Sequence, residues 1–228
     1  MNVSLLYKKE YYQLKIHTIS VVIYNVDGLR ISDQPMKEEH GIWTYETELL
    51  PGEYLYKFLV NESLFLFDPS NNLYEQDRDG YLWSLIIIDK DGDRLVNSEQ
   101  YHLTLTEYKL DLNTSNNRLK GYSHAIESKI VTTINFSEVT GIHGVTGVWY
   151  TADETVFEYA ETAVCSEEQE QVYVMFWIGQ ESAILFASED IWVFRLFIDG
   201  ILALEDYFLI KNGERIKCKI RSTAVNND

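Results

Sequence analysis

The sequence has little that would fix its fold or its place in the cell through covalent or membrane chemistry. Its 228 residues include only two cysteines, too few for the disulfide framework of small secreted domains. No apolar run approaches the roughly 18 residues needed to span a bilayer, and the first residues lack the basic, apolar and small-residue order of a signal peptide. We therefore expect a cytoplasmic protein with reduced thiols at Cys165 and Cys218.

Positive charge is also scarce. The chain has 19 Lys and Arg against 36 Asp and Glu, for a net charge of −17. Such a chain repels phosphate backbones and anionic lipid surfaces, so neither nucleic acid nor a membrane is expected as a partner. A neutral sugar is compatible with this charge, because sugar binding depends on stacking and hydrogen bonds.

Catalytic and metal-binding motifs are absent from the sequence. It has no GxSxG, P-loop, HExxH or Rossmann glycine pattern, and its five histidines are scattered. His143, which lies beside glycines, is predicted to be a loop residue. The carboxylates within Asp89–Asp93 suggest calcium, but Gly92 comes one place too early for an EF-hand loop, so an Asp-Gly turn is predicted. No enzyme activity, cofactor or metal is therefore expected.

Aromatic residues, by contrast, are abundant. They make up 14% of the chain, with 16 tyrosines and only three prolines, which suits β-strands. The length fits two sandwich domains of about 100 residues each. The polar stretch Arg94–Gln100 follows the Asp-Gly turn and marks a boundary. These features predict an all-β protein with two immunoglobulin-like β-sandwich domains in tandem, at residues 1–98 and 99–228.

The stretch from Gly41 to Ser84 carries the clearest strand pattern. Leu50-Pro51-Gly52 breaks the alternation and predicts a tight reversal. In the strand that follows, Leu55, Lys57 and Leu59 share one face. The opposite face is formed by Tyr54, Tyr56, Phe58 and Val60. We therefore predict one core-facing side and one outward side for this strand.

Six features in this stretch occur in a characteristic order and spacing. They lie in Leu50-Pro51-Gly52-Glu53-Tyr54, in Tyr56-Lys57-Phe58-Leu59-Val60, at Phe65 before Asp68-Pro69, and at Gly80. Together they resemble the glycogen-binding domain of AMP-activated kinase β subunits, part of carbohydrate-binding module family 48. The resemblance covers the chain from Leu14 to Asp89. It implies an early-set, immunoglobulin-like β-sandwich that binds α-glucan.

The resemblance also implies roles for three side chains. In the family, an aromatic at the position of Phe65 stacks on a glucose ring, and a lysine at that of Lys57 hydrogen-bonds sugar hydroxyls. From the residues alone, Phe65 is equally a core aromatic, and Lys57 is equally a solvated or snorkelling strand lysine. Trp83 replaces a family asparagine and is either a substitute platform or a buried residue. The apolar residues on both faces of its strand favour burial.

One family feature is missing. The first tryptophan of the family site falls near Leu29 to Ile31, where this sequence has no tryptophan. We therefore expect weak sugar binding at most.

The second half is predicted to contain further strands separated by turn signals, as in a sandwich. They are expected at Tyr101–Leu112, Lys129–Phe136, Thr146–Tyr150, Thr155–Val164, Val172–Ile178, Ile191–Ile198 and Leu202–Ile210. The last two, joined by Asp199-Gly200, resemble the final hairpin of bacterial immunoglobulin-like domains. This resemblance implies a fold and no function.

These observations predict a non-catalytic module that binds an α-glucan or glycogen-like oligosaccharide, or a regulatory module derived from one. Lys57, Phe65 and Trp83 are its candidate carbohydrate-binding residues. The alternative is a protein-protein interaction module that kept the sandwich scaffold and lost the sugar site. In that case Leu55 and Leu59 would meet a protein partner or the second domain.

Overall fold

The chain folds as an all-β protein with two immunoglobulin-like β-sandwiches, as predicted. The computed structural model describes residues 1–71, 73–77, 81–96, 102–113, 129–165, 171–179, 191–211 and 214–217. The predicted boundary at 98/99, Gly80 and Cys218 lie outside these residues. Among the described residues, no helix has both the length and the apolar character to cross a membrane. We refer to residues up to 96 as the first half and to those from 102 as the second half.

The first half contains two sheets and one short helix. The first sheet has the order β1-β5-β4 and consists of β1 (Asn2–Lys8), β5 (Ile42–Glu48) and β4 (Lys37–Glu39). The second has the order β3-β2-β6-β9-β8 and consists of β3 (Arg30–Pro35), β2 (Ile19–Asn25), β6 (Gly52–Val60), β9 (Leu82–Ile88) and β8 (Tyr74–Gln76). Two short elements complete this half: β7 (Leu64–Leu66), which pairs with β6, and the 3-10 helix η1 (Tyr11–Gln13).

The core of the first half lies between these two sheets, and the predicted alternation of β6 is confirmed there. The four predicted core residues, Tyr54, Tyr56, Phe58 and Val60, are all buried. Tyr7 of β1 meets Phe58 from the opposite sheet, with the ring centroids 5.2 Å apart in an edge-to-face contact. β9 is a central strand between β6 and β8, as its apolar sequence predicts. The predicted Asp-Gly turn is also present. In it, the Asp89 carboxylate accepts hydrogen bonds from the backbone N–H groups of Asp91 and Asp93.

The second half is also built from two sheets. One, in the order β10-β11-β14, consists of β10 (His102–Asn113), β11 (Lys129–Thr140) and β14 (Gln171–Gly179). The other, in the order β13-β12-β15-β16-β17, consists of β13 (Val156–Cys165), β12 (Ile142–Tyr150), β15 (Ile191–Ile198), β16 (Ile201–Lys211) and β17 (Glu214–Lys217). All seven predicted strands are present, and β15 and β16 form the predicted hairpin around Asp199-Gly200. The thiol of Cys165 is free, as expected, and the residue is exposed.

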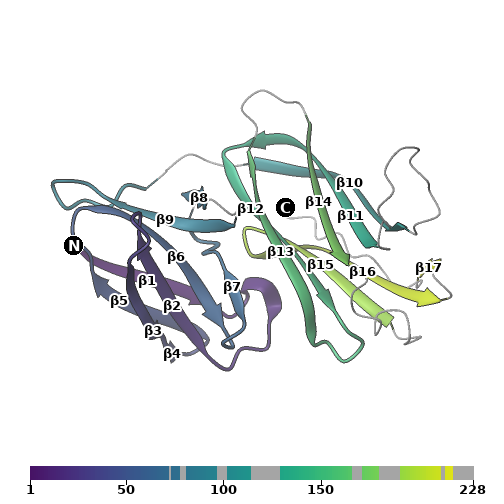
Figure 1. Cartoon of the computed structure of the whole chain (residues 1–228), viewed down its shortest axis with the longest axis horizontal. Helices are drawn as coiled ribbons and strands as arrows, with labels where there is room; N and C mark the ends of the chain where they lie inside the picture. Colours follow the sequence, from purple (N-terminus) through teal and green to yellow (C-terminus); the bar gives the residue numbers. More distant parts are fainter. Residues whose placement is uncertain are drawn as a thin grey trace.

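The described strands pair only within their own half, yet the apolar core continues from one half to the other. Figure 1 shows the two sandwiches side by side, with η1 and β7 on the side of the first half that faces the second. The buried cluster of the first half includes Val148, Tyr150, Val193 and Phe197 from the second half. The ring of Phe197 lies 5.4 Å from that of Tyr12 in η1. The two sandwiches are therefore packed together through apolar side chains.

Candidate functional site

The candidate site lies on one face of the β3-β2-β6-β9-β8 sheet. We call the side of this sheet that points away from the core the outer face. Because side chains alternate along a strand, Leu55, Lys57 and Leu59 of β6 point to it, as does Trp83 of β9. The second half covers one part of the outer face, and the other part is an open groove. The three predicted sugar-binding residues lie at or beside this division.

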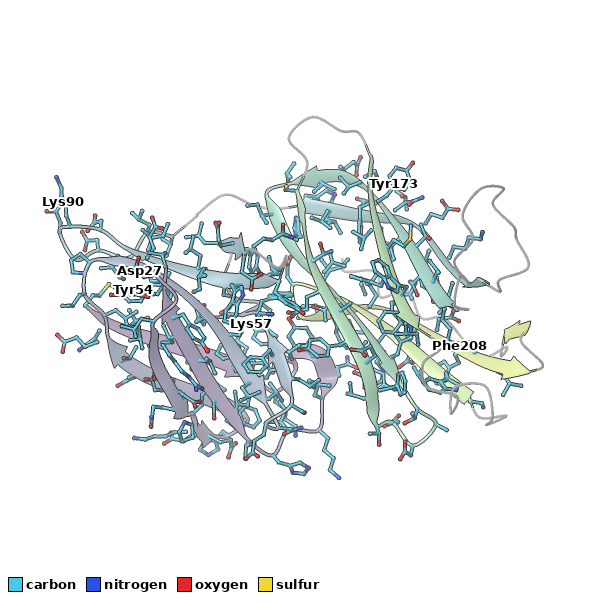
Figure 2. The ribbon with its side chains drawn as sticks, in the orientation of Figure 1. Asp27, Tyr54, Lys57, Lys90, Tyr173 and Phe208 are labelled. Carbon is cyan, nitrogen blue, oxygen red and sulfur yellow. The ribbon has the colours of Figure 1, made fainter. Side chains whose placement is uncertain are left out.

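Lys57 lies in the covered part. Its Nζ is 2.8 Å from Oε2 of Glu161 on β13, and the two side chains are only 5% and 4% exposed. Nζ also donates to the carbonyl oxygen of Phe65 at 3.4 Å. Figure 2 shows Lys57 between the two halves. The prediction of a solvated lysine is therefore wrong, and a protein carboxylate occupies the position where the family resemblance implies sugar hydroxyls.

Glu161 is the partner that buries Lys57. Its Oε1 accepts a second hydrogen bond, at 3.2 Å, from the backbone N–H of Phe67. Burial raises the pKa of the Glu161 carboxyl, while the charge and hydrogen bond of Lys57 and the Phe67 N–H oppose this shift. The pair is separated by 104 residues in sequence, so no local pattern predicts it.

Phe65 lies beside this ion pair on β7. Its side chain is 38% exposed, so the alternative of a core aromatic is wrong. The backbone N–H of Phe65 donates to the hydroxyl of Tyr159 on β13 at 3.1 Å. Phe65 therefore borders the contact between the halves, and its stacking on a sugar stays a prediction.

The loop after β7 packs against two glycines of the second half. The ring of Phe67 covers Gly144, where an added Cβ would lie 2.2 Å from Cζ of the ring. Pro69 covers Gly200 in the same way, with an added Cβ 2.4 Å from Cγ. The backbone N–H of Tyr12 donates to the carbonyl oxygen of Gly200 at 2.9 Å. We call these contacts, together with the Lys57–Glu161 pair, the seam.

His143, next to Gly144, is buried under the seam and is not the loop residue predicted from its glycine neighbours. Its Nδ1 lies 2.7 Å from Oδ2 of Asp199, and its Nε2 lies 3.0 Å from the Thr140 carbonyl oxygen and 3.2 Å from that of His102. Because all three oxygens accept hydrogen bonds, the doubly protonated imidazolium fits this site best. Burial opposes the charge, but the hydrogen bond and charge of Asp199, with the two carbonyl groups, raise the pKa of His143 above its ordinary value of 6.5.

This raised pKa predicts a pH-dependent stability. The imidazolium stabilises the folded state fully below pH 6.5, the ordinary value, and this contribution is lost as the pH rises through the higher folded pKa. His143→Gln should therefore lower the free energy of unfolding by roughly 1.5–3 kcal/mol in acidic buffer and by less in alkaline buffer. Urea denaturation across this pH range measures the difference. His102→Gln, on an exposed side chain beside Glu138, is the control. A loss that is constant with pH would contradict the charged state.

The open part of the outer face is a groove of about 620 Å³, which we call the Trp83 groove. Trp83 and Tyr24 of β2 are both half-buried in it, with ring centroids 5.7 Å apart and planes at 84°. The Trp83 Nε1 donates to Oδ2 of Asp77 at 2.8 Å. Burial of Trp83 in the core, which its sequence favours, is therefore wrong. Trp83 forms part of a wall that a ligand can reach.

Polar groups surround these two rings. The other residues that line the Trp83 groove are Asn25, Val26, Asp27, Gly28, Glu53, Leu55, Glu75, Gln76, Asp77 and Leu85. Figure 2 places Asp27 farther from the second half than Lys57 is. This lining offers aromatic surface for stacking and amide and carboxylate groups for hydrogen bonds to hydroxyls. Within the described ranges, no group of three or more His, Cys, Asp or Glu could hold a metal ion.

No family model and no curated protein matches the chain. It is similar to the structure of a glycosyl hydrolase family 2 member from Bacteroides cellulosilyticus, with 11% identity and a TM-score of 0.32 over 95% of this chain and 28% of that one. It is also similar to Bacteroides uniformis beta-glucuronidase 2, with 8% identity and a TM-score of 0.28 over 92% of this chain and 26% of that one.

A third similar structure is the major pilin subunit of Bacillus cereus, with 10% identity and a TM-score of 0.23 over 95% of this chain and 69% of that one. The chain therefore spans only 28% and 26% of the two hydrolases. None of these three is a glycogen-binding domain, so the resemblance of residues 14–89 to that family rests on the sequence motif. At such identities and TM-scores these likenesses carry no conclusion about what this chain does.

Proposed function

We propose that this protein is a non-catalytic carbohydrate-binding module and that it takes a glucan chain in the Trp83 groove. The observation that carries this proposal is the accessible pair of rings, Trp83 and Tyr24, in a groove lined with hydrogen-bonding groups. A sugar ring presents an apolar face for stacking and hydroxyls around its edge, and the groove offers a partner for each. The resemblance to glycogen-binding domains supports an α-linked glucan.

The position of the binding surface differs from that implied by the family residues. Lys57 is held by Glu161, and Phe65 borders the seam, so neither forms part of the Trp83 groove lining. Trp83 is the only one of the three predicted residues that does. We therefore assign the main stacking role to Trp83 and treat Phe65 as an extension of the surface toward the seam.

Trp83→Ala should weaken binding of maltoheptaose about tenfold, because a stacked aromatic contributes ~1–3 kcal/mol per ring. Wild-type affinity is expected near millimolar, or about −4 kcal/mol, since the first family tryptophan is missing. Titration calorimetry or chemical-shift mapping measures both values. Leu6→Ala, an exposed position on β1, is the matched control and should bind as wild type does. A folded wild-type protein that shows no binding at ~10 mM sugar contradicts the proposal.

A second function is favoured by a specific observation, the covered part of the outer face. The second half already contacts Lys57 and Phe65, so this sheet already packs against another folded part of the same chain. In this alternative, the chain is a protein-interaction module. The remaining apolar positions of the same sheet, such as Leu55, would bind a partner protein. If the folded protein binds no sugar, the protein-interaction function becomes the favoured one.

A further inference from the structure

We propose that the Trp83 groove selects sugars that carry positive charge, that is, oligomers of amino sugars with free amino groups. This inference rests on the proposed function, sugar binding in the Trp83 groove, and extends its ligand class from neutral glucans to amino sugars. Four carboxylates line the groove, from Asp27, Glu53, Glu75 and Asp77, whereas its described lining includes no Lys or Arg. A ligand in the groove therefore meets a strongly negative potential beside two aromatic rings.

The four carboxylates differ in what they can offer a ligand. Asp77 is engaged with the protein, because it accepts from the Trp83 Nε1 at 2.8 Å and from the backbone N–H of Tyr81 at 2.9 Å. It fixes the orientation of the Trp83 ring. Glu53 and Glu75 have exposed side chains and belong to β6 and β8, the strands on either side of β9. They therefore flank the strand that carries Trp83.

The protein already holds one ammonium group against this ring. The Nζ of Lys57 lies 5.4 Å from the centroid of the Trp83 ring while it is paired with Glu161 at 2.8 Å. An ammonium is attracted both by the face of an aromatic ring and by a carboxylate. A sugar ammonium in the Trp83 groove would meet the same two kinds of partner, with Glu53 or Glu75 in place of Glu161.

The charge of a sugar also determines how tightly each class of sugar should bind in the groove. A sulfated or uronic-acid glycan is repelled by the groove carboxylates and by the net charge of −17. A neutral glucan gains stacking and hydrogen bonds but no charge attraction. An amino sugar gains all three and loses the charge attraction when its nitrogen is acetylated. The N-acetylated oligomer is therefore a matched probe of the same size.

The test is titration of the full chain with three oligomers of equal length: glucosamine, N-acetylglucosamine and maltooligosaccharide. The buffer pH is set below the amine pKa, so that the glucosamine oligomer is charged. We expect the glucosamine oligomer to bind about tenfold more tightly than its N-acetylated form, from the cation–π and charge attraction together. This advantage should fall as salt is added, because exposed carboxylates are screened.

The net charge of the chain attracts any polycation, so the control must separate the groove from the whole surface. Glu53→Gln/Glu75→Gln removes two carboxylates from the groove, and Glu46→Gln/Glu48→Gln removes two exposed ones from β5 of the other sheet. The groove variant should lose the preference for glucosamine, and the β5 variant should keep it. Equal losses in both variants would overturn the inference, as would an oligolysine that binds as tightly and competes for the groove.

The two proposals fail in different ways. If maltooligosaccharide binds and glucosamine binds no more tightly, charge selection is overturned while the proposed function stands. If no oligomer binds to the folded protein, the proposed function fails and the inference fails with it.

Discussion

Replacing Lys57 with methionine should lower the free energy of unfolding by about 3–5 kcal/mol, the usual loss when one partner of a buried ion pair is removed. The Glu161 side chain is 4% exposed in the wild-type protein, and the substitution leaves the Phe67 N–H as its remaining hydrogen-bond donor among the described residues. Urea denaturation followed by circular dichroism measures the change. This is the largest effect we expect from a single side chain.

The companion variant is Lys57→Met/Glu161→Met. Because it replaces both charges with apolar groups of similar size, it should recover most of the loss. Lys37→Met, an exposed lysine on β4, is the matched control and should stay within about 0.5 kcal/mol of wild type. If the double variant is as unstable as the single one, the two charges do not act as a pair and our account of the seam fails.

Gly144→Ala should be the second most damaging change, although it adds a single methyl group. The new Cβ would lie 2.2 Å from Cζ of Phe67, and the Phe67 ring is completely buried, so it has no free direction in which to move. We expect a loss of about 1–3 kcal/mol, typical of overpacking in a tightly packed core. The loss should come with a larger radius of gyration in small-angle scattering, as the halves move apart.

Gly147→Ala provides the comparison. Its Cβ would also meet aromatic rings, 2.8 Å from Phe176 and 3.0 Å from Phe194, but both belong to the second half. It should therefore destabilise the chain without a change in its overall dimensions. A Gly144→Ala protein with wild-type stability and wild-type scattering would show that Phe67 does not rest on this glycine.

Local patterns predicted most of the strands. The alternation in β6 identified the buried face of Tyr54, Tyr56, Phe58 and Val60, because a side-chain period of two is a property of any strand. The same alternation correctly placed Lys57 on the outer face, but it did not predict which residues surround the lysine there. What covers an outward residue depends on a segment 104 residues away, and no property of β6 itself encodes that contact.

The candidate site was predictable only in part, for the same reason. Trp83 was identified because it stands at the position of a family asparagine. Tyr24 on β2 and Asp77 just after β8 contact it, but neither is one of the residues that define the motif. Likewise His143 and Asp199 are 56 residues apart, and the glycine beside each of them predicts only a local turn or loop. A single sequence carries no signal for such pairs.

The shared apolar core has a consequence for synthesis of the chain. The ribosome releases the first half well before Val148 and Phe197, which complete the buried cluster around Tyr12. Until then, Tyr12 lacks its contact with Phe197, Phe67 lacks Gly144, and Lys57 lacks its partner Glu161. Domains generally fold in order of emergence, but here the first sandwich reaches its final packing only when the second arrives. The packing around Tyr12 is therefore completed only after Phe197 has been synthesised.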